Sequence, residues 1–327
     1  MTTKKFPNNF LRLPVELVYR ICDFLDAETI LSSFRCVCKQ FYHIANTYNQ
    51  YKIYSQSTFK KIIICQMIHL ENIILLDLIE DSIDFFLLCF VKQQFTRLRS
   101  LSLCQMTNDQ LHTVLKHIPK YSHLTSFSIQ SNLPNDDTFL WPVECNLKKI
   151  SFHNCTFKQF YSILQNSRYI QSLTVNDCSI NNIDLNLRLN VYHHLTSLTF
   201  NDLRIIMDKL EFLLQLVPSL VHLNLTSSGK PFEFIRRLSQ WEEFISTYLP
   251  YLRQLEFHIF CFQFDWEYFD SLISSFRSPF WLVEKHWFVT CQFRDDWSSS
   301  FTIFTTTMNS TDGFYQRPRI SDEIQLN

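Results

Sequence analysis

A spaced pattern of apolar positions recurs along the chain from about residue 70. Each copy has the form L-x-x-L-x-L, with apolar residues at the first, fourth and sixth places. Apolar and polar residues alternate over the second half of each copy, which is typical of a short strand with one buried face. Clear copies start at Leu98, Leu124, Leu147, Ile170, Leu195, Leu220 and Leu252, and a degenerate copy starts at Leu70.

Helical patterns separate these predicted strands. Residues 109–117 and 209–217 carry apolar residues at helical spacing, and Pro119 or Pro218 follows each run. Proline cannot continue a helix, so each proline returns the chain to the next strand. The chain is therefore predicted to alternate strands with helices, which is the α/β fold class.

The repeating unit resembles an irregular leucine-rich repeat. Successive clear copies start 23 to 32 residues apart, largely within the 20–29 residues of that family. The ninth place, where the family normally has Asn or Cys, is Asn132, Cys155 and Cys178 in three copies only. The resemblance implies a curved solenoid with a parallel sheet, built from seven or eight units over residues 70–297.

The N-terminal stretch predicts three short helices. Pro14 suits the first turn of a helix that carries Leu17, Ile21, Phe24 and Leu25 at helical spacing. Asp26 can cap a second helix, in which Ile30, Leu31 and Phe34 share one face. Val37 and Phe41 carry the apolar series into a third helix.

These residues resemble the F-box family, whose motif runs Leu-Pro-x-Glu-Leu, an apolar residue, and then a Val-(Ser/Cys)-Lys-x-aromatic run. Gln40 stands where the family usually has Arg or Trp. The resemblance implies docking onto a Skp-family adaptor, and through it onto a cullin. It also implies that a set of apolar residues contacts the adaptor or orients the helices that do: Leu13, Pro14, Leu17, Ile21, Leu31 and Phe34.

Four segments follow from these patterns. We expect an F-box over residues 9–50, a helical linker over 51–69, the repeats over 70–297 and a polar tail over 298–327. Residues 280–293 alternate like a strand and are expected to cover the last repeat, as solenoids require. The final twenty residues are expected to be mobile.

Composition excludes several classes of function. The net charge is −1, and the pair Arg236-Arg237 is too small a basic patch for nucleic acid. Charged residues interrupt the most apolar window, residues 62–91, so we expect no membrane span. The start of the sequence lacks a secretory signal, so we expect a cytoplasmic or nuclear protein whose 11 cysteines are thiols.

Motifs for catalysis or for cofactor binding are absent from the sequence. With only Gly229 and Gly313 in the chain, no glycine-rich phosphate loop can form. Cys36 and Cys38 are too close together for the usual zinc pair, and no nucleophile motif occurs. We therefore expect a protein that is not an enzyme and that holds no cofactor or metal.

The fifth and seventh places of each copy should share the solvent face of the sheet. Small polar residues dominate these places, which suits the binding of an unidentified protein substrate. The candidate substrate-binding residues are Ser128, Ser151, His153, Thr174, Asn176, Thr199 and Asn201. At the eighth place, Asp177 and Asp202 are either turn residues or two carboxylates close enough to interact.

Three functions fit these observations. The first is a substrate-recognition subunit of a Skp–cullin–F-box ubiquitin ligase. The second is a leucine-rich repeat scaffold whose F-box-like helices have become a terminal cap, which the substitution at Gln40 would favour. The third is an enzyme with an unrecognised site between repeats, against which the missing motifs count.

Overall fold

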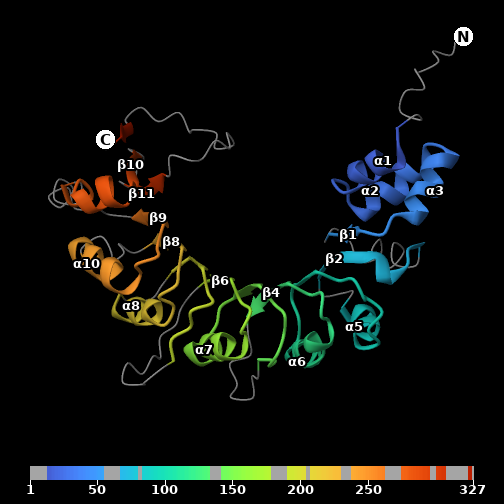
Figure 1. Cartoon of the computed structure of the whole chain (residues 1–327), viewed down its shortest axis with the longest axis horizontal. Helices are drawn as coiled ribbons and strands as arrows, with labels where there is room; N and C mark the ends of the chain where they lie inside the picture. Colours follow the sequence, from blue (N-terminus) through green and yellow to red (C-terminus); the bar gives the residue numbers. More distant parts are fainter. Residues whose placement is uncertain are drawn as a thin grey trace, which may run out of the picture. The chain divides into compact units, whose positions relative to one another are not determined.

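The chain forms two compact units that are described separately. Unit 1 comprises Met1–Pro134 and Phe139–Leu147, and unit 2 comprises Asn135–Thr138 and Lys148–Asn327. A computed structural model, drawn in Figure 1, describes residues 13–54, 67–79, 83–132, 141–177, 190–203, 207–229, 237–261, 274–294, 300–306 and 323–325.

Unit 1 begins with the three predicted helices. They are α1 (Val15–Cys22), α2 (Ala27–Ser32) and α3 (Lys39–Thr47), with a 3-10 turn, η2 (Phe34–Cys36), between the last two. The Asp26 carboxylate accepts a hydrogen bond from the Thr29 backbone N–H at 2.6 Å, which confirms the predicted cap of the second helix. The small core of this bundle contains Val18, Phe41 and Ile44.

The third helix leads directly into a strand. Strand β1 (Tyr51–Ile53) pairs in parallel with β2 (Ile73–Leu78). The predicted helical linker over 51–69 is therefore wrong at its start, and its residues 55–66 lie outside the described part of the chain. Tyr51 and Ile53 are buried, so the β propensity of this short segment is realised through packing against the helices and β2.

Hydrogen bonds join β1 to the N-terminal helices. The Tyr51 hydroxyl donates to the Ala45 carbonyl, and the Lys52 ammonium donates to the Asp23 carbonyl. The Tyr48 hydroxyl donates to Asp23 Oδ1 at 2.8 Å. Burial raises the pKa of the Tyr51 phenol to about 12. The helices and the first strand thus share one buried interface.

The rest of unit 1 follows the predicted alternation of strand and helix. Strands β2, β3 (Ser100–Leu103) and β4 (Ser126–Asn132) are parallel neighbours in that order. Helices α5 (Ile83–Val91) and α6 (Asn108–His117) connect them, accompanied by 3-10 turns η3 (Leu70–Asn72) and η5 (Ile118–Lys120). The helix predicted over 109–117 is confirmed, and it starts at a capping box between Thr107 and Gln110.

Unit 2 continues the same plan. Its parallel strands are β5 (Lys149–His153), β6 (Ser172–Asn176), β7 (Ser197–Asn201), β8 (His222–Gly229) and β9 (Gln254–Cys261). Helices α7 (Phe157–Asn166), α8 (Met207–Gln215) and α10 (Leu238–Tyr248) lie along one face of these strands (Figure 1). Helix α8 corresponds to the prediction over 209–217. The apolar fourth and sixth places of β5 to β9 are buried beneath the helices, as predicted.

A left-handed backbone turn follows four of the strands at the eighth place of the repeat. The φ angles are 55° at Gln105, 51° at Asn154, 50° at Asp177 and 53° at Asp202. Asn and Asp tolerate this conformation better than most side chains. The geometry therefore supports the interpretation of Asp177 and Asp202 as turn residues.

The C-terminal part of unit 2 departs from the prediction. Residues Phe280–Glu284 form a short π-helical segment, η7, and only Phe288–Arg294 forms a strand, β10. The strand beside β9 is instead β11 (Ser300–Thr306), which pairs antiparallel with both β9 and β10. β11 and β12 (Glu323–Gln325), which pairs with β10, both fall within the predicted polar tail.

Three tryptophans of unit 2 are buried. Trp281 and Trp287 have ring centroids 5.6 Å apart, and Trp241 on α10 is also fully buried. The Trp281 indole N–H donates to Glu242 Oε1 at 2.7 Å, and the Trp287 N–H donates to the Arg253 carbonyl at 2.9 Å. Buried indole donors are therefore satisfied, as apolar cores require.

Replacing a fourth-place leucine tests whether the helical side of the strands is a packed core. We expect Leu198→Ala in β7 to lower the free energy of unfolding by about 2–5 kcal/mol, because the side chain is fully buried. The neighbouring Thr199→Ala variant, on the solvent face, should change it by less than about 0.5 kcal/mol. Urea unfolding followed by fluorescence measures both values, and equal effects would contradict this packing.

The stability of unit 2 should depend on pH through His194. Burial, followed by the nearby His193, lowers the pKa of His194. The unfolded state then binds more protons than the folded state near pH 6, so stability is full above about pH 6.5 and falls as the pH drops through the folded pKa. In urea unfolding at about pH 7.5 and about pH 5.0, His194→Gln should reduce the pH dependence of the stability of unit 2. The control His222→Gln, at an exposed position of the same unit, should leave that dependence unchanged.

Candidate functional site

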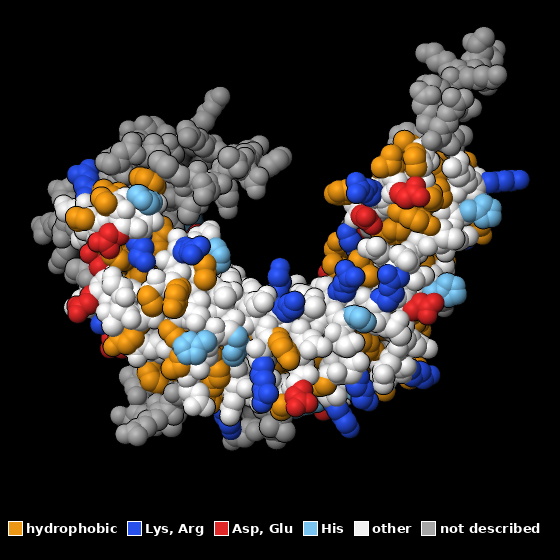
Figure 2. Space-filling view, viewed as in Figure 1, with side chains coloured by type: hydrophobic (Ala, Val, Ile, Leu, Met, Phe, Trp, Pro, Cys, Tyr) orange, Lys and Arg blue, Asp and Glu red, His pale blue; other side chains and the backbone are white. Residues whose placement is uncertain are grey.

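Five large apolar side chains are exposed over the N-terminal helices. They are Val15 and Leu17 on α1, Phe24 after α1, Val37 before α3 and Tyr42 on α3. Phe24 is 90% exposed and Leu17 is 44% exposed. Figure 2 shows hydrophobic side chains gathered on the surface of this bundle. We call these five residues the apolar set, and their exposure suits docking onto another protein.

The predicted adaptor-binding residues divide into outer and inner groups. Pro14 and Leu17 are exposed, and Leu13, Ile21 and Phe34 are half-buried. Leu31 is buried at 5% exposure, so it can only orient the helices. Leu13 and Phe34 pack against the core of the bundle, where the Phe34 and Phe41 rings stack with centroids 4.3 Å apart.

Other members of the apolar set were not among the predicted contacts. The helical pattern placed Phe24 with the apolar face of the first helix, but α1 ends at Cys22 and the side chain leaves that register. Val37 precedes α3, whose N-terminal Cys38 Sγ accepts a hydrogen bond from the Phe41 N–H at 3.5 Å. The exposure of both residues depends on where the helices end, which periodicity alone locates poorly.

Arg35 holds one aromatic member of the apolar set. Its guanidinium carbon lies 4.5 Å from the centroid of the Tyr42 ring, a cation–π contact. A hydrogen bond from Arg35 also lowers the pKa of the Tyr42 phenol. The ring is therefore held in place while remaining accessible to a partner.

The open face of the sheet in unit 2 carries three rows of polar side chains in register. Paired residues of neighbouring strands define these rows, and in the third row a hydrogen bond from Thr226 to Asn201 joins β8 to β7. We call these rows together the polar face. They run Lys149, Ser172, Ser197, His222, Gln254; then Ser151, Thr174, Thr199, Asn224, Glu256; then His153, Asn176, Asn201, Thr226, His258.

Side-chain hydrogen bonds run along these rows. Asn201 Nδ2 donates to Asn176 Oδ1 at 2.7 Å, and the Thr226 hydroxyl donates to Asn201 Oδ1 at 3.4 Å. Asn224 Nδ2 donates to Glu256 Oε2 at 2.9 Å. These bonds orient the amide groups and the Glu256 carboxylate, which suits recognition of a polypeptide by hydrogen bonding.

The structure brings six of the seven predicted substrate-binding residues onto the polar face. Ser151, Thr174 and Thr199 share one row, and His153, Asn176 and Asn201 share another. The seventh residue, Ser128, lies on β4 of unit 1, where it pairs with Ser102. All seven side chains are partly exposed.

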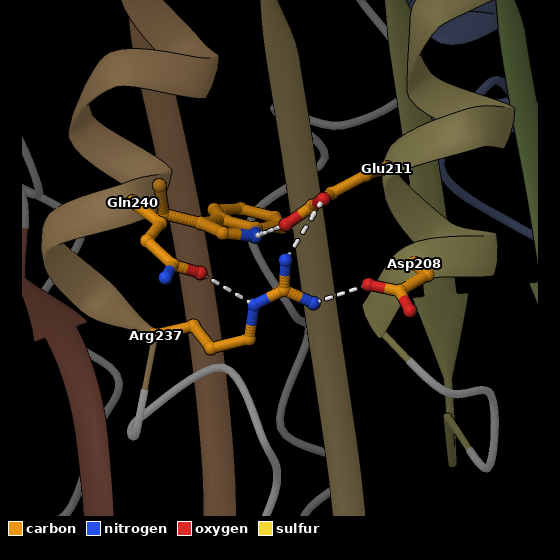
Figure 3. Close-up of polar contacts among 5 residues, drawn as sticks. Asp208, Glu211, Arg237 and Gln240 are labelled. Carbon is orange, nitrogen blue, oxygen red and sulfur yellow. Dashed lines mark hydrogen bonds and ion pairs between the residues drawn. The ribbon is translucent and has the colours of Figure 1, made fainter.

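A charged cluster lies on the opposite, helical side of unit 2, between α8 and α10 (Figure 3). Arg237 contacts the carboxylate of Asp208, and it lies 3.6 Å from Glu211 Oε2. It also donates to Gln240 Oε1 at 2.7 Å, and the Trp241 indole donates to Glu211 Oε1 at 3.0 Å. The two carboxylates compensate the guanidinium charge, so this cluster joins two helices and is not an anion site.

No group of three or more His, Cys, Asp or Glu side chains in the described part of the chain is placed to hold a metal ion. None of the helices that the structure describes is both long and apolar enough to cross a membrane.

Comparisons with known proteins identify the N-terminal region. Residues 10–53 match the model of the F-box-like family. The matched range includes all three helices of the bundle and ends at Ile53, the last residue of β1. No curated protein matches the chain. The protein therefore contains an F-box-like domain at residues 10–53, a kind of domain that generally binds Skp-type adaptors.

Proposed function

We propose that this protein is the substrate-recognition subunit of a Skp–cullin–F-box ubiquitin ligase. The F-box-like domain would bind a Skp-family adaptor, and the remainder would bind a substrate protein in the cytoplasm or nucleus. The observation that carries the proposal is the F-box-like match at residues 10–53 on a helical bundle that leaves apolar side chains exposed.

Burial of the apolar set would supply the adaptor affinity. Removing a large apolar side chain from water contributes roughly 1.5–3 kcal/mol, and a few such residues usually dominate an interface. Phe24 and Leu17 are the strongest candidates because both are large and exposed. Leu13 and Phe34 would hold the helices in the docking geometry from within.

The region after the F-box-like domain is proposed to be an irregular leucine-rich repeat solenoid. Parallel strands recur with the apolar pattern, helices return the chain, and left-handed turns follow four strands at the same repeat position. Such repeats commonly bind partners on the face that their strands line. We assign substrate binding to the polar face on this basis.

The protein would act by tethering and would not perform the chemistry. Holding a substrate beside a ubiquitin-charged enzyme raises the effective concentration of substrate lysines. No residue of this chain needs to act as an acid, a base or a nucleophile in that mechanism.

A non-catalytic scaffold is the second candidate. Gln40, exposed at the start of α3, replaces the Arg or Trp usual in the motif, and such a change would favour an F-box that serves only as a terminal cap. The double variant Pro14→Ala/Leu17→Ala, at two exposed positions, separates the two functions. Loss of adaptor binding with an unchanged thermal transition supports the ligase subunit, and a loss of stability alone supports the cap.

Adaptor binding should depend on Leu17. We expect Leu17→Asp to weaken binding of a Skp-family adaptor to the full chain at least tenfold, because a carboxylate would be buried at the interface. Leu88→Asp is the matched control, since Leu88 is an exposed leucine on α5 of the same unit. Titration of each purified variant with the adaptor, alongside its thermal transition, measures the effect.

Two results would count against this assignment. Equal weakening by both variants would indicate a non-specific effect of charge, and unchanged affinity in Leu17→Asp would exclude this side of α1 from the interface. The full chain is required, since β1 within the F-box-like match takes its strand partner from β2.

A further inference from the structure

Charge is almost absent from the polar face, apart from two residues on its two outermost strands, β5 and β9. Of its fifteen positions, only Lys149 on β5 and Glu256 on β9 carry a formal charge when His is neutral. The remainder are Ser, Thr, Asn, Gln and His. A cationic group and an anionic group therefore flank an uncharged, hydrogen-bonding surface.

The Glu256 carboxylate is held in a defined position. Oε2 accepts from Asn224 Nδ2 at 2.9 Å, and Oε1 accepts from Gln254 Nε2. The Gln254 side-chain oxygen in turn lies 2.7 Å from His222 Nδ1. Each carboxylate oxygen keeps a lone pair for a further donor. Among the residues that the structure describes, none forms an ion pair with Glu256.

Lys149 is exposed at the other end, and no described residue forms an ion pair with it either. Four strand spacings separate β5 from β9, which is about 19 Å at ~4.8 Å for each spacing. An extended polypeptide covers about 3.3 Å for each residue, so about six residues span this distance.

We propose that the polar face binds an extended polypeptide segment that crosses the strands, with a Lys or Arg of the segment paired to Glu256 and an acidic residue about six positions away paired to Lys149. Uncharged residues of the segment would hydrogen-bond to the rows between these two ends. This inference rests on the proposed function, because it defines the substrate class that the same face would recognise.

Charge complementarity favours this occupant over others. A nucleic acid would bring phosphates toward Glu256 and would find a single lysine, which is far too little positive charge. A mainly apolar partner would remove water from the Lys149 and Glu256 side chains and would offer neither of them a charged or hydrogen-bonding group in return. An extended segment with one residue of each charge satisfies both ends.

Fluorescent nonapeptide pools would test the proposal on the full chain, measured both alone and in the presence of a Skp-family adaptor. The test pools are uncharged apart from a Lys and a Glu six positions apart, in either order, and the reference pool has Gln at both positions. We expect the better test pool to bind about fivefold more tightly than the reference pool at low salt, and the preference to weaken as salt rises.

Variants of the same protein, measured with the same pools, show which residues cause the peptide preference. Glu256→Gln should remove the contribution of the peptide Lys, and Glu256→Lys should make pools with two Glu residues the preferred ones. Lys149→Gln should remove the contribution of the peptide Glu. Glu243→Gln, which makes the same charge change at an exposed position of α10, should leave the preference intact.

The outcomes separate this inference from the proposed function. Equal binding of all pools by the unmodified protein, or a Lys preference that survives Glu256→Gln, overturns the inference even when the adaptor remains bound. Loss of adaptor binding in a protein that still prefers the charged pools would overturn the ligase role and leave the peptide-binding face.

Discussion

The exposed edge of a β-sheet can pair with another chain, so proteins cover or shorten their edge strands. In each unit, a terminal element covers one such edge. A single strand–helix repeat cannot bury its apolar side alone, so each repeat depends on the repeats next to it. In unit 1 the first strand is β1, and it belongs to the F-box-like match and to the N-terminal bundle alike. The bonds from Tyr51 and Lys52 tie the bundle to this edge. The F-box-like domain therefore supplies the first strand of the sheet in unit 1 as well as the helical bundle. In unit 2, β11 covers the edge of β9 in the same way.

Much of the strand and helix order followed from the sequence, because burial imposes a period on the chain. The leucines of the repeat recur wherever a strand passes under a helix, and the strands lie where that pattern predicts. The positions outside the pattern were harder to place. β1 is three residues long, and the threonine-rich β11 looked like polar tail. Both become strands only through partners that are distant in the sequence, and local composition carries little information about such pairing.

The candidate sites likewise have some features that the sequence predicted and others that it did not. Alternation along a strand placed the fifth and seventh positions on one face, and the registered pairs confirm that arrangement in unit 2. The exposure of Phe24 was not predictable from the period of α1, since it depends on a helix end. Nor could the sequence show that Asn224 and Gln254 both hold the carboxylate of Glu256. Gln254 lies two positions away on the same strand, but Asn224 is on another strand, 32 positions earlier.

The central claim is that the exposed apolar side chains at the N-terminus dock onto an adaptor. Co-expression of the full chain with a Skp-family adaptor, followed by purification and measurement of the mass in solution, tests it most directly. The account predicts a stable one-to-one complex in which hydrogen exchange slows over α1, α3 and their connections. Separate elution of the two proteins at micromolar concentration, with this chain folded, would contradict it.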